Sequence, residues 1–178
     1  MSDTLITMIA ILLAAILMFI FPLLSISERS DDISQLSVQT ATTEFVDNSR
    51  AIGKITIDNY EKLISTIQAT GNSYDVEMEV KVLDENIGKK SAWTQGTVIG
   101  ENVYYSVYTS QILDTIQNAN NSNGVYAMKE GDIFSVSIKN TNKTMSQTIR
   151  GVFYSIAGGD VYSIAAQHSG VVTANGSY

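Results

Sequence analysis

Twenty consecutive residues without a charge, Leu5–Leu24, constrain this chain more than any other feature of its sequence. As a helix, they would be about 30 Å long, which matches the hydrocarbon core of a bilayer. A soluble domain of the size that remains could not cover an apolar surface on all sides of such a helix. The sequence therefore predicts an N-terminal transmembrane anchor over residues 1–24, in contact with membrane lipid.

The flanks of the anchor leave its processing and its orientation open. A cleaved signal peptide carries a basic N-terminal region, whereas Met1–Thr4 has no Lys or Arg and contains Asp3. Ser25-Ile26-Ser27 would nevertheless suit a signal peptidase. Arg29 is the single cation close to the far end, so the positive-inside rule does not decide the orientation. We expect the anchor to be retained. We also expect the C-terminal domain to lie outside the cytoplasm, because an N-terminal segment of four residues can readily stay on the cytoplasmic side.

Residues 25–52 contain neither Gly nor Pro and keep an apolar stripe, which predicts an amphipathic helical stalk that continues the anchor. The stripe consists of Val38, Ala41, Phe45 and Ile52, with Ile33 and Leu36 nearby. Pro22, the only proline, lies in the last turn of the anchor. It favours either a kink near the membrane surface or the end of the helix there.

The remaining residues, 53–178, predict one small α+β domain packed on the stalk, with an antiparallel or mixed sheet and short helices. Strict alternation over Asp75–Leu83 predicts a strand with Val76, Met78, Val80 and Val82 on one face. Further strands are expected over residues 102–108, 132–139 and 161–172. Residues 86–100, which include Trp93, indicate a loop or an irregular hairpin. Residues 173–178 indicate a loose tail.

Three short helices are expected in this domain. Asp58 and Glu61 resemble a capping box before the apolar face Tyr60, Leu63, Ile64 and Ile67, with Gly71 past the end. Thr109 or Ser110 would cap the second helix, which carries Ile112, Leu113 and Ile116. Thr144 and Gln147 form a capping box for the third, whose apolar positions are Met145, Ile149, Val152, Phe153 and Ile156.

Composition and motifs argue against most chemistry. The residues after Leu24 hold all 11 Lys and Arg and all but one of the 18 Asp and Glu, so their net charge is negative. A negative charge repels the phosphates of nucleic acid, which is therefore not an expected partner. Without cysteine there is no thiolate nucleophile and no Cys-ligated metal. His168, the only histidine, lacks a nucleophile-elbow pattern around it. We expect no enzyme and no cofactor; a tethered hydrolase would need an acidic cleft around Asp84 or Asp132.

Tyrosines make the domain poor in charge but rich in amphipathic rings. Tyr104, Tyr105 and Tyr108 lie close together in one predicted strand, which favours a surface for a protein partner. The alternative is that they are half-buried strand residues. No small-molecule ligand is indicated.

The layout of Leu5–Ile52 resembles the type IV pilin-like superfamily: an apolar helix near the N-terminus, one proline about twenty residues along, and an amphipathic continuation that supports a small sheet. It is most similar to the minor, pseudopilin-type subunits of tight-adherence pilus systems, although the run has no glutamate near its start. The resemblance implies that the helices bundle in a filament or rest in the membrane. Pro22 would be the kink point, and Val38, Ala41 and Phe45 would seat the domain.

Two hypotheses follow for function. The first is a non-enzymatic pilin-like subunit or assembly component of a surface filament or secretion apparatus, which associates with itself or with similar subunits. The small residues Ala10, Ala14 and Ala15, between Leu5 and Leu24, allow close approach of helices. The alternative is a monomeric, membrane-tethered binding module that uses the Tyr-rich sheet.

Overall fold

The computed structural model describes residues 2–84, 104–118, 124–157 and 163–176. Its elements in chain order are α1 (Ser2–Ile52), β1 (Lys54–Thr56), α2 (Ile57–Gln68), β2 (Tyr74–Leu83), β3 (Tyr104–Tyr108), α3 (Thr109–Gln117), β4 (Val125–Ala127), β5 (Ile133–Asn140), α5 (Met145–Ala157) and β6 (Ala165–Val171). The predicted α+β fold is confirmed: a long N-terminal helix packs against small antiparallel sheets with short helices.

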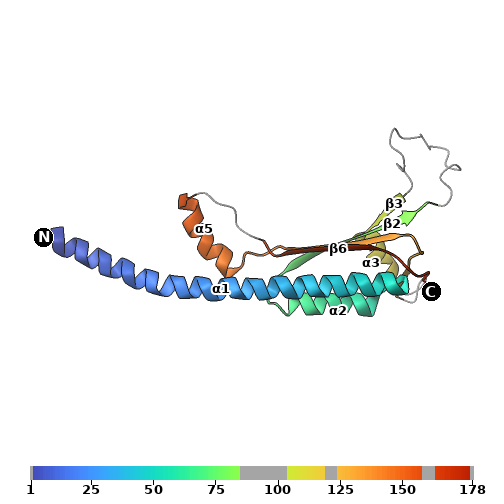
Figure 1. The fold of residues 1–178 in the computed structure, drawn as a ribbon, viewed down its shortest axis with the longest axis horizontal. Coiled ribbons are helices and arrows are strands. Elements are labelled where there is room, and N and C mark those ends of the chain that lie inside the picture. Colours follow the sequence, from blue (N-terminus) through green and yellow to red (C-terminus); the bar gives the residue numbers. More distant parts are fainter. Residues whose placement is uncertain (1, 85–103, 119–123, 158–162, 177–178) are drawn as a thin grey trace, which may run out of the picture.

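Helix α1 runs without interruption for 51 residues, through Pro22 and into the stalk. Figure 1 shows it as one gently curved rod, whose N-terminal part extends well past the domain. The predicted continuation of the anchor into a stalk is therefore confirmed, and the helix does not end at Pro22. A proline removes one backbone donor but leaves the rest of the hydrogen-bond ladder, so a helix can bend and continue.

The main sheet has four antiparallel strands in the order β3-β2-β5-β6. The strand predicted over Asp75–Leu83 corresponds to β2, and its apolar residues face the core together with those of β5. Phe134, Val136 and Ile138 of β5 are fully buried, a cleaner alternation than the sequence indicated. Phe134 meets Phe45 of α1 edge to face, with ring centroids 5.8 Å apart. The core thus lies between one face of the sheet and the stalk, with α2 beside it (Figure 1).

A second, two-stranded sheet pairs β1 with β4 at the C-terminal end of α1, and the sequence analysis missed it. Gly53 connects α1 to β1 with a φ of +70°, and a Cβ there would lie 2.2 Å from the carbonyl oxygen of Ala174. The predicted loose tail is wrong as far as residue 176. Thr173 and Gly176 donate backbone hydrogen bonds to Arg50 and Met128, at 3.0 and 2.9 Å.

Helix boundaries were predicted with mixed success. Thr56, not Asp58, caps α2, because its hydroxyl accepts the backbone N–H of Asn59 at 3.3 Å. Tyr108, not Thr109 or Ser110, is the N-cap of α3.

The capping box of α5 is confirmed. Gln147 Oε1 accepts from the Thr144 backbone N–H at 3.1 Å, and Thr144 Oγ1 accepts from the Gln147 N–H at 3.3 Å. The predicted loop around Trp93 and the first residues of the last predicted strand lie outside the described residues. Met145 is exposed rather than part of a packed apolar face.

Candidate functional site

The anchor half of α1 receives no cover from the domain. Its most apolar 18-residue window is 0% buried, and α1 is the one helix in the described part of the chain that is long and apolar enough to cross a membrane. Of the residues predicted for the membrane helix, Leu5, Ala10, Ala14, Ala15 and Pro22 are exposed, whereas Leu24 is partly covered. The helix is compatible with single-pass membrane topology.

The stalk half of α1 packs on the sheet through a stripe that the sequence located only in part. Val38, Ala41 and Phe45 lie in the core. Ile52 does not, because α1 ends there and the chain turns away at Gly53; its side chain is 40% exposed. The buried residues that the sequence analysis missed on this half are Val46, Thr42 and Ser49.

The part of the stalk nearest the anchor is joined to the domain by polar contacts. Thr144 Oγ1 donates to Asp31 Oδ2 at 2.7 Å, and Ser146 Oγ donates to the same oxygen. Arg150 Nε donates to Glu28 Oε1 at 3.0 Å. These contacts join α1 to the start of α5.

One helical turn farther on, Gln35 makes two hydrogen bonds with the backbone of Ala165 at the start of β6, at 2.6 and 3.0 Å. No sequence pattern predicted any of these contacts, because the partners are more than 100 residues apart.

The outer face of the stalk carries apolar residues that the domain leaves uncovered. Ile26, Ile33 and Leu36 are exposed large side chains, whereas the sequence analysis had placed Ile33 and Leu36 next to the packing stripe. Their spacing of seven and three residues sets them on one side of the helix, as a continuation of the exposed anchor. We call Ile26, Ile33 and Leu36 the outer stripe.

The three tyrosines predicted as a partner surface all lie on β3 and are exposed, but not on one face. The register pairs Tyr108 with Glu79 and Tyr104 with Leu83, whereas Tyr105 pairs with Val82, whose side chain points to the core side. Tyr104 and Tyr108 therefore share the open face of the sheet, because directly paired residues of antiparallel strands point the same way. Tyr105 lies on the opposite face, at the edge.

The open face of the sheet contains a polar hollow next to Tyr108 and the start of α3. Its lining includes Glu77, Glu79, Ser135, Ser137 and Gln167. Ser106 Oγ donates to Glu79 Oε1 at 2.7 Å, and Lys139 Nζ lies 3.8 Å from Glu77 Oε2. These groups offer hydrogen bonds to a polar ligand or to solvent.

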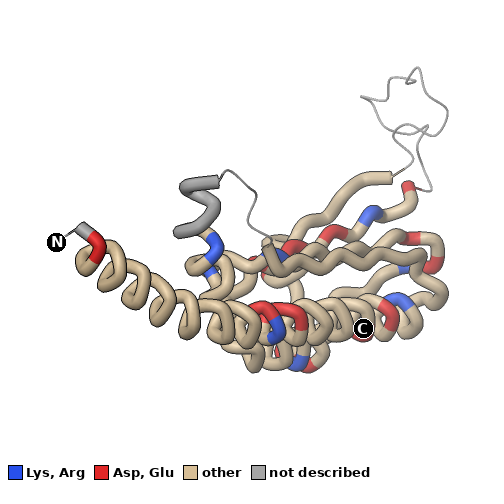
Figure 2. The backbone as a smooth tube through the Cα atoms, turned by 60° about the vertical axis from the view of Figure 1, so that its left-hand side comes forward, with Lys and Arg blue, Asp and Glu red and all other residues tan. Residues whose placement is uncertain are grey.

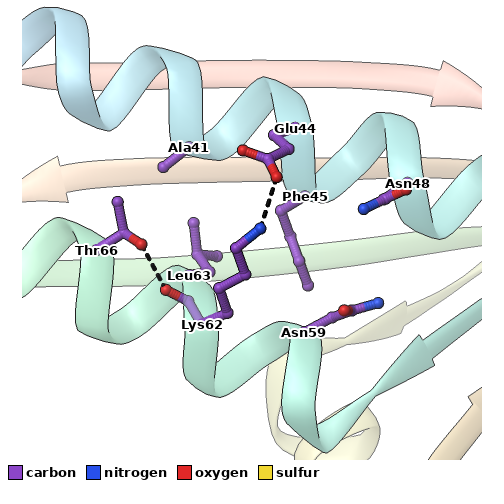
Figure 3. A pocket seen from close by; sticks show the side chains of 8 residues that line it. All are labelled: Ala41, Glu44, Phe45, Asn48, Asn59, Lys62, Leu63 and Thr66. Carbon is purple, nitrogen blue, oxygen red and sulfur yellow. Dashed lines mark hydrogen bonds and ion pairs between the residues drawn. The ribbon is translucent and has the colours of Figure 1, made fainter.

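A smaller groove lies between α1 and α2 and holds no ligand-sized space. Figure 3 shows Lys62 of α2 reaching across it to Glu44 of α1, an ion pair of 2.7 Å. Its volume is about 40 Å³. That volume accommodates a few water molecules.

Several titratable side chains form hydrogen bonds that hold the fold together. His168 Nε2 lies 3.1 Å from Asp47 Oδ1, and Arg50 Nε donates to the same oxygen at 2.8 Å. The hydrogen bond to His168, followed by Arg50, holds the pKa of Asp47 below its ordinary value. Asp132 is buried, and its carboxylate accepts the backbone N–H groups of Leu83 and Lys129 at 2.9 and 2.8 Å.

Asp132 therefore fixes a turn rather than facing a cleft. Within the described residues, no group of three or more His, Asp or Glu is placed to hold a metal ion.

Comparisons with models of known protein families, with curated proteins and with solved structures find no match. The geometry of α1 and of the sheet therefore indicates the function.

Proposed function

We propose that this protein is a non-enzymatic, pilin-like structural subunit or assembly component of a cell-surface filament or secretion apparatus, anchored or polymerised through α1. One observation carries the proposal: the first half of α1 has apolar side chains on every side and no part of the domain covers them.

The anchor half of α1 requires an apolar medium. Transfer of one Leu, Ile or Phe side chain out of water is worth about 1.5–3 kcal/mol. Leu5, Ile9, Leu12, Phe19 and Phe21 are only some of the exposed large side chains in the anchor. All the exposed large apolar side chains of the anchor together amount to tens of kcal/mol, so the anchor belongs in a bilayer or among other helices.

The shape of the molecule supports assembly through the same element. In Figure 1 the domain occupies the C-terminal end of α1 and leaves the anchor clear of every other element. Ala10 and Ala14 are one turn apart, so they allow a neighbouring helix to approach closely. The outer stripe continues this uncovered surface past the anchor and gives a second copy more of the helix to pack against.

The proposed orientation puts the domain outside the cytoplasm. Its support is a domain that is poor in charged residues and rich in Ser, Thr and Asn. Protease added to intact cells should then cleave the domain and leave the anchor.

Cysteine cross-linking tests the assembly, since the chain has no cysteine of its own. Leu36→Cys, in the outer stripe, should form disulfide-linked dimers in oxidised producing cells. Thr66→Cys, exposed on α2, is the matched control. Shearing the cells should release the Leu36→Cys species in a sedimentable extracellular fraction if the filament is formed. A chain that stays monomeric at both positions contradicts assembly.

The polar hollow on the open sheet face favours one other candidate, a monomeric membrane-tethered binding module. Tyr108, 59% exposed, borders a hollow whose lining includes carboxylates and hydroxyls of the strands and the first two residues of α3. Such a module should extract from membranes as a monomer in mild detergent, whereas the structural subunit should extract as an oligomer.

A further inference from the structure

Helix α5 stands apart from the compact part of the domain. Figure 1 shows it crosswise to α1, clear of the sheet and leaning toward the N-terminal end of α1. Among the described elements its main neighbour is α1, and Met145 at its start is 60% exposed. Met145 belongs to the apolar side of this 13-residue helix, and the domain leaves that side chain uncovered.

The contacts of α5 fix its height above the membrane. Ser146 contacts Asp31, and one turn later Arg150 contacts Glu28, so α5 approaches the anchor as the chain proceeds. Glu28 is four residues past Leu24, which corresponds to about 6 Å along the helix axis. The headgroup layer is roughly 5–8 Å deep on each side of the hydrocarbon. Arg150 therefore lies at the level of the lipid headgroups.

The sequence of α5 suits that level. Between Met145 and Ala157 there is no Asp or Glu, and the wider stretch of residues 133–159 contains Lys139, Lys143 and Arg150 without a single acid. Figure 2 shows basic residues at the base of α5, in a molecule that is otherwise acidic. Met145 and Ile149 are one turn apart on the same side of the helix. A helix with an apolar side and without acidic residues can lie in the membrane interface, and the pairing of Arg150 with Glu28 lowers the cost of placing that acid there.

We propose that α5 is an interfacial helix that rests on the bilayer surface beside the anchor, with its apolar side in the boundary between headgroups and acyl chains. This inference rests on the proposed membrane anchoring of α1. Two contacts with the membrane, α1 through it and α5 on it, fix how the domain is turned relative to the membrane plane. The polar contacts of Glu28 and Asp31 then transmit that orientation to the stalk.

Fluorescence of single-cysteine variants tests the proposal in the full-length chain. The chain is reconstituted in vesicles of phosphatidylcholine and phosphatidylglycerol, with an environment-sensitive dye on Met145→Cys. Lipids that carry a nitroxide on the headgroup or on an adjacent acyl carbon serve as quenchers. We expect a blue-shifted emission and strong quenching at this position. The matched control is Gln39→Cys, exposed on α1 about 22 Å past Leu24, where neither quencher should act.

A third variant separates the two proposals. Ala15→Cys, at the middle of the anchor, should be quenched by a third lipid, which carries its nitroxide near the end of the acyl chain, whenever α1 crosses the bilayer. Quenching at Ala15→Cys together with a Met145→Cys signal no stronger than that of Gln39→Cys overturns the interfacial helix and leaves the anchor intact. Absence of quenching at Ala15→Cys overturns the anchor itself, and the inference with it. The melting temperature of each labelled variant in detergent, compared with that of the parent chain, checks that the fold is kept.

Discussion

The two halves of α1 have the same secondary structure but obtain their cover from different sources. In the stalk half, Val38 and Phe45 are buried by the sheet, and the opposite side of the helix is exposed. In the anchor half, residues as large as Phe19 are exposed on all sides. The comparison teaches that only one half of this continuous helix depends on the domain for its burial, so the other half requires a separate apolar environment.

The largest expected effect contrasts the same substitution in the two halves. Phe45→Ala removes a ring that is 5% exposed and packs on Phe134, and it should lower the free energy of unfolding of the domain by about 3–5 kcal/mol. Phe19→Ala removes a ring that is 77% exposed and should leave that free energy unchanged. Denaturant unfolding of the full chain in detergent measures both. A comparable loss in the two variants would mean that the anchor packs on the domain.

The second prediction concerns the point where the stalk half ends. Gly53→Ala combines a left-handed backbone with a Cβ that would lie 2.2 Å from Ala174 O, so it should cost about 2–4 kcal/mol of domain stability. Gly71 has a φ of +80° and open space around it, so Gly71→Ala should cost only about 1–2 kcal/mol. Thermal unfolding of both variants separates the steric term from the backbone term. Equal losses would mean that the tail does not dock at Gly53.

The third prediction tests the polar contacts where the two halves meet. Asp31→Ala leaves the hydroxyls of Thr144 and Ser146 without their carboxylate and should weaken the attachment of α5 by about 1–3 kcal/mol. Asp32→Ala, on the neighbouring exposed residue, is the control. Hydrogen exchange of amides in residues 145–151 should accelerate in Asp31→Ala alone. Unchanged exchange there would show that other contacts hold α5.

The sequence predicted those parts of the fold in which local pattern and tertiary burial coincide. The alternation of Val76, Met78, Val80 and Val82 follows the two faces of β2, because one face is packed and the other is open. The long apolar run from Leu5 to Leu24 likewise predicted a helix, which forms the first part of α1. Beyond Leu24, the apolar stripe predicted to pack on the domain is buried at Val38 and Phe45, where the sheet lies beside α1. Ile52, at the end of α1, is exposed instead.

The remaining features depend on contacts between distant segments, which no local pattern records. The pairing of β1 with β4 involves three residues in each strand, too few for a period to show. Asp31 and Thr144 form a hydrogen bond, but no pattern in the residues around either of them predicts it. Tyr104 and Tyr105 are neighbours in a strand and must point to opposite faces, but the register with β2 decides which of them lies on the open face.

The smallest expected effect lies at the far end of the stalk half, where Asp47 contacts His168 and Arg50. The pKa of Asp47 is lowered from its ordinary value of 3.8, first by the hydrogen bond to His168 and then by Arg50. The folded state therefore binds the proton on Asp47 less readily than the unfolded state. The stabilisation is present above pH 3.8 and is lost as the pH falls through the lowered pKa.

Asp47→Asn removes this titration while keeping the size of the side chain. The parent chain should be slightly more stable than the variant above pH 3.8, and the difference should shrink as the pH falls below that value. Because both groups are partly exposed, we expect a shift of the melting temperature that is small beside that of Phe45→Ala. Melting curves of both chains in detergent, recorded across the acid range, check the sign. A difference that instead grows toward low pH would mean that the contact with His168 and Arg50 does not stabilise the ionised carboxylate.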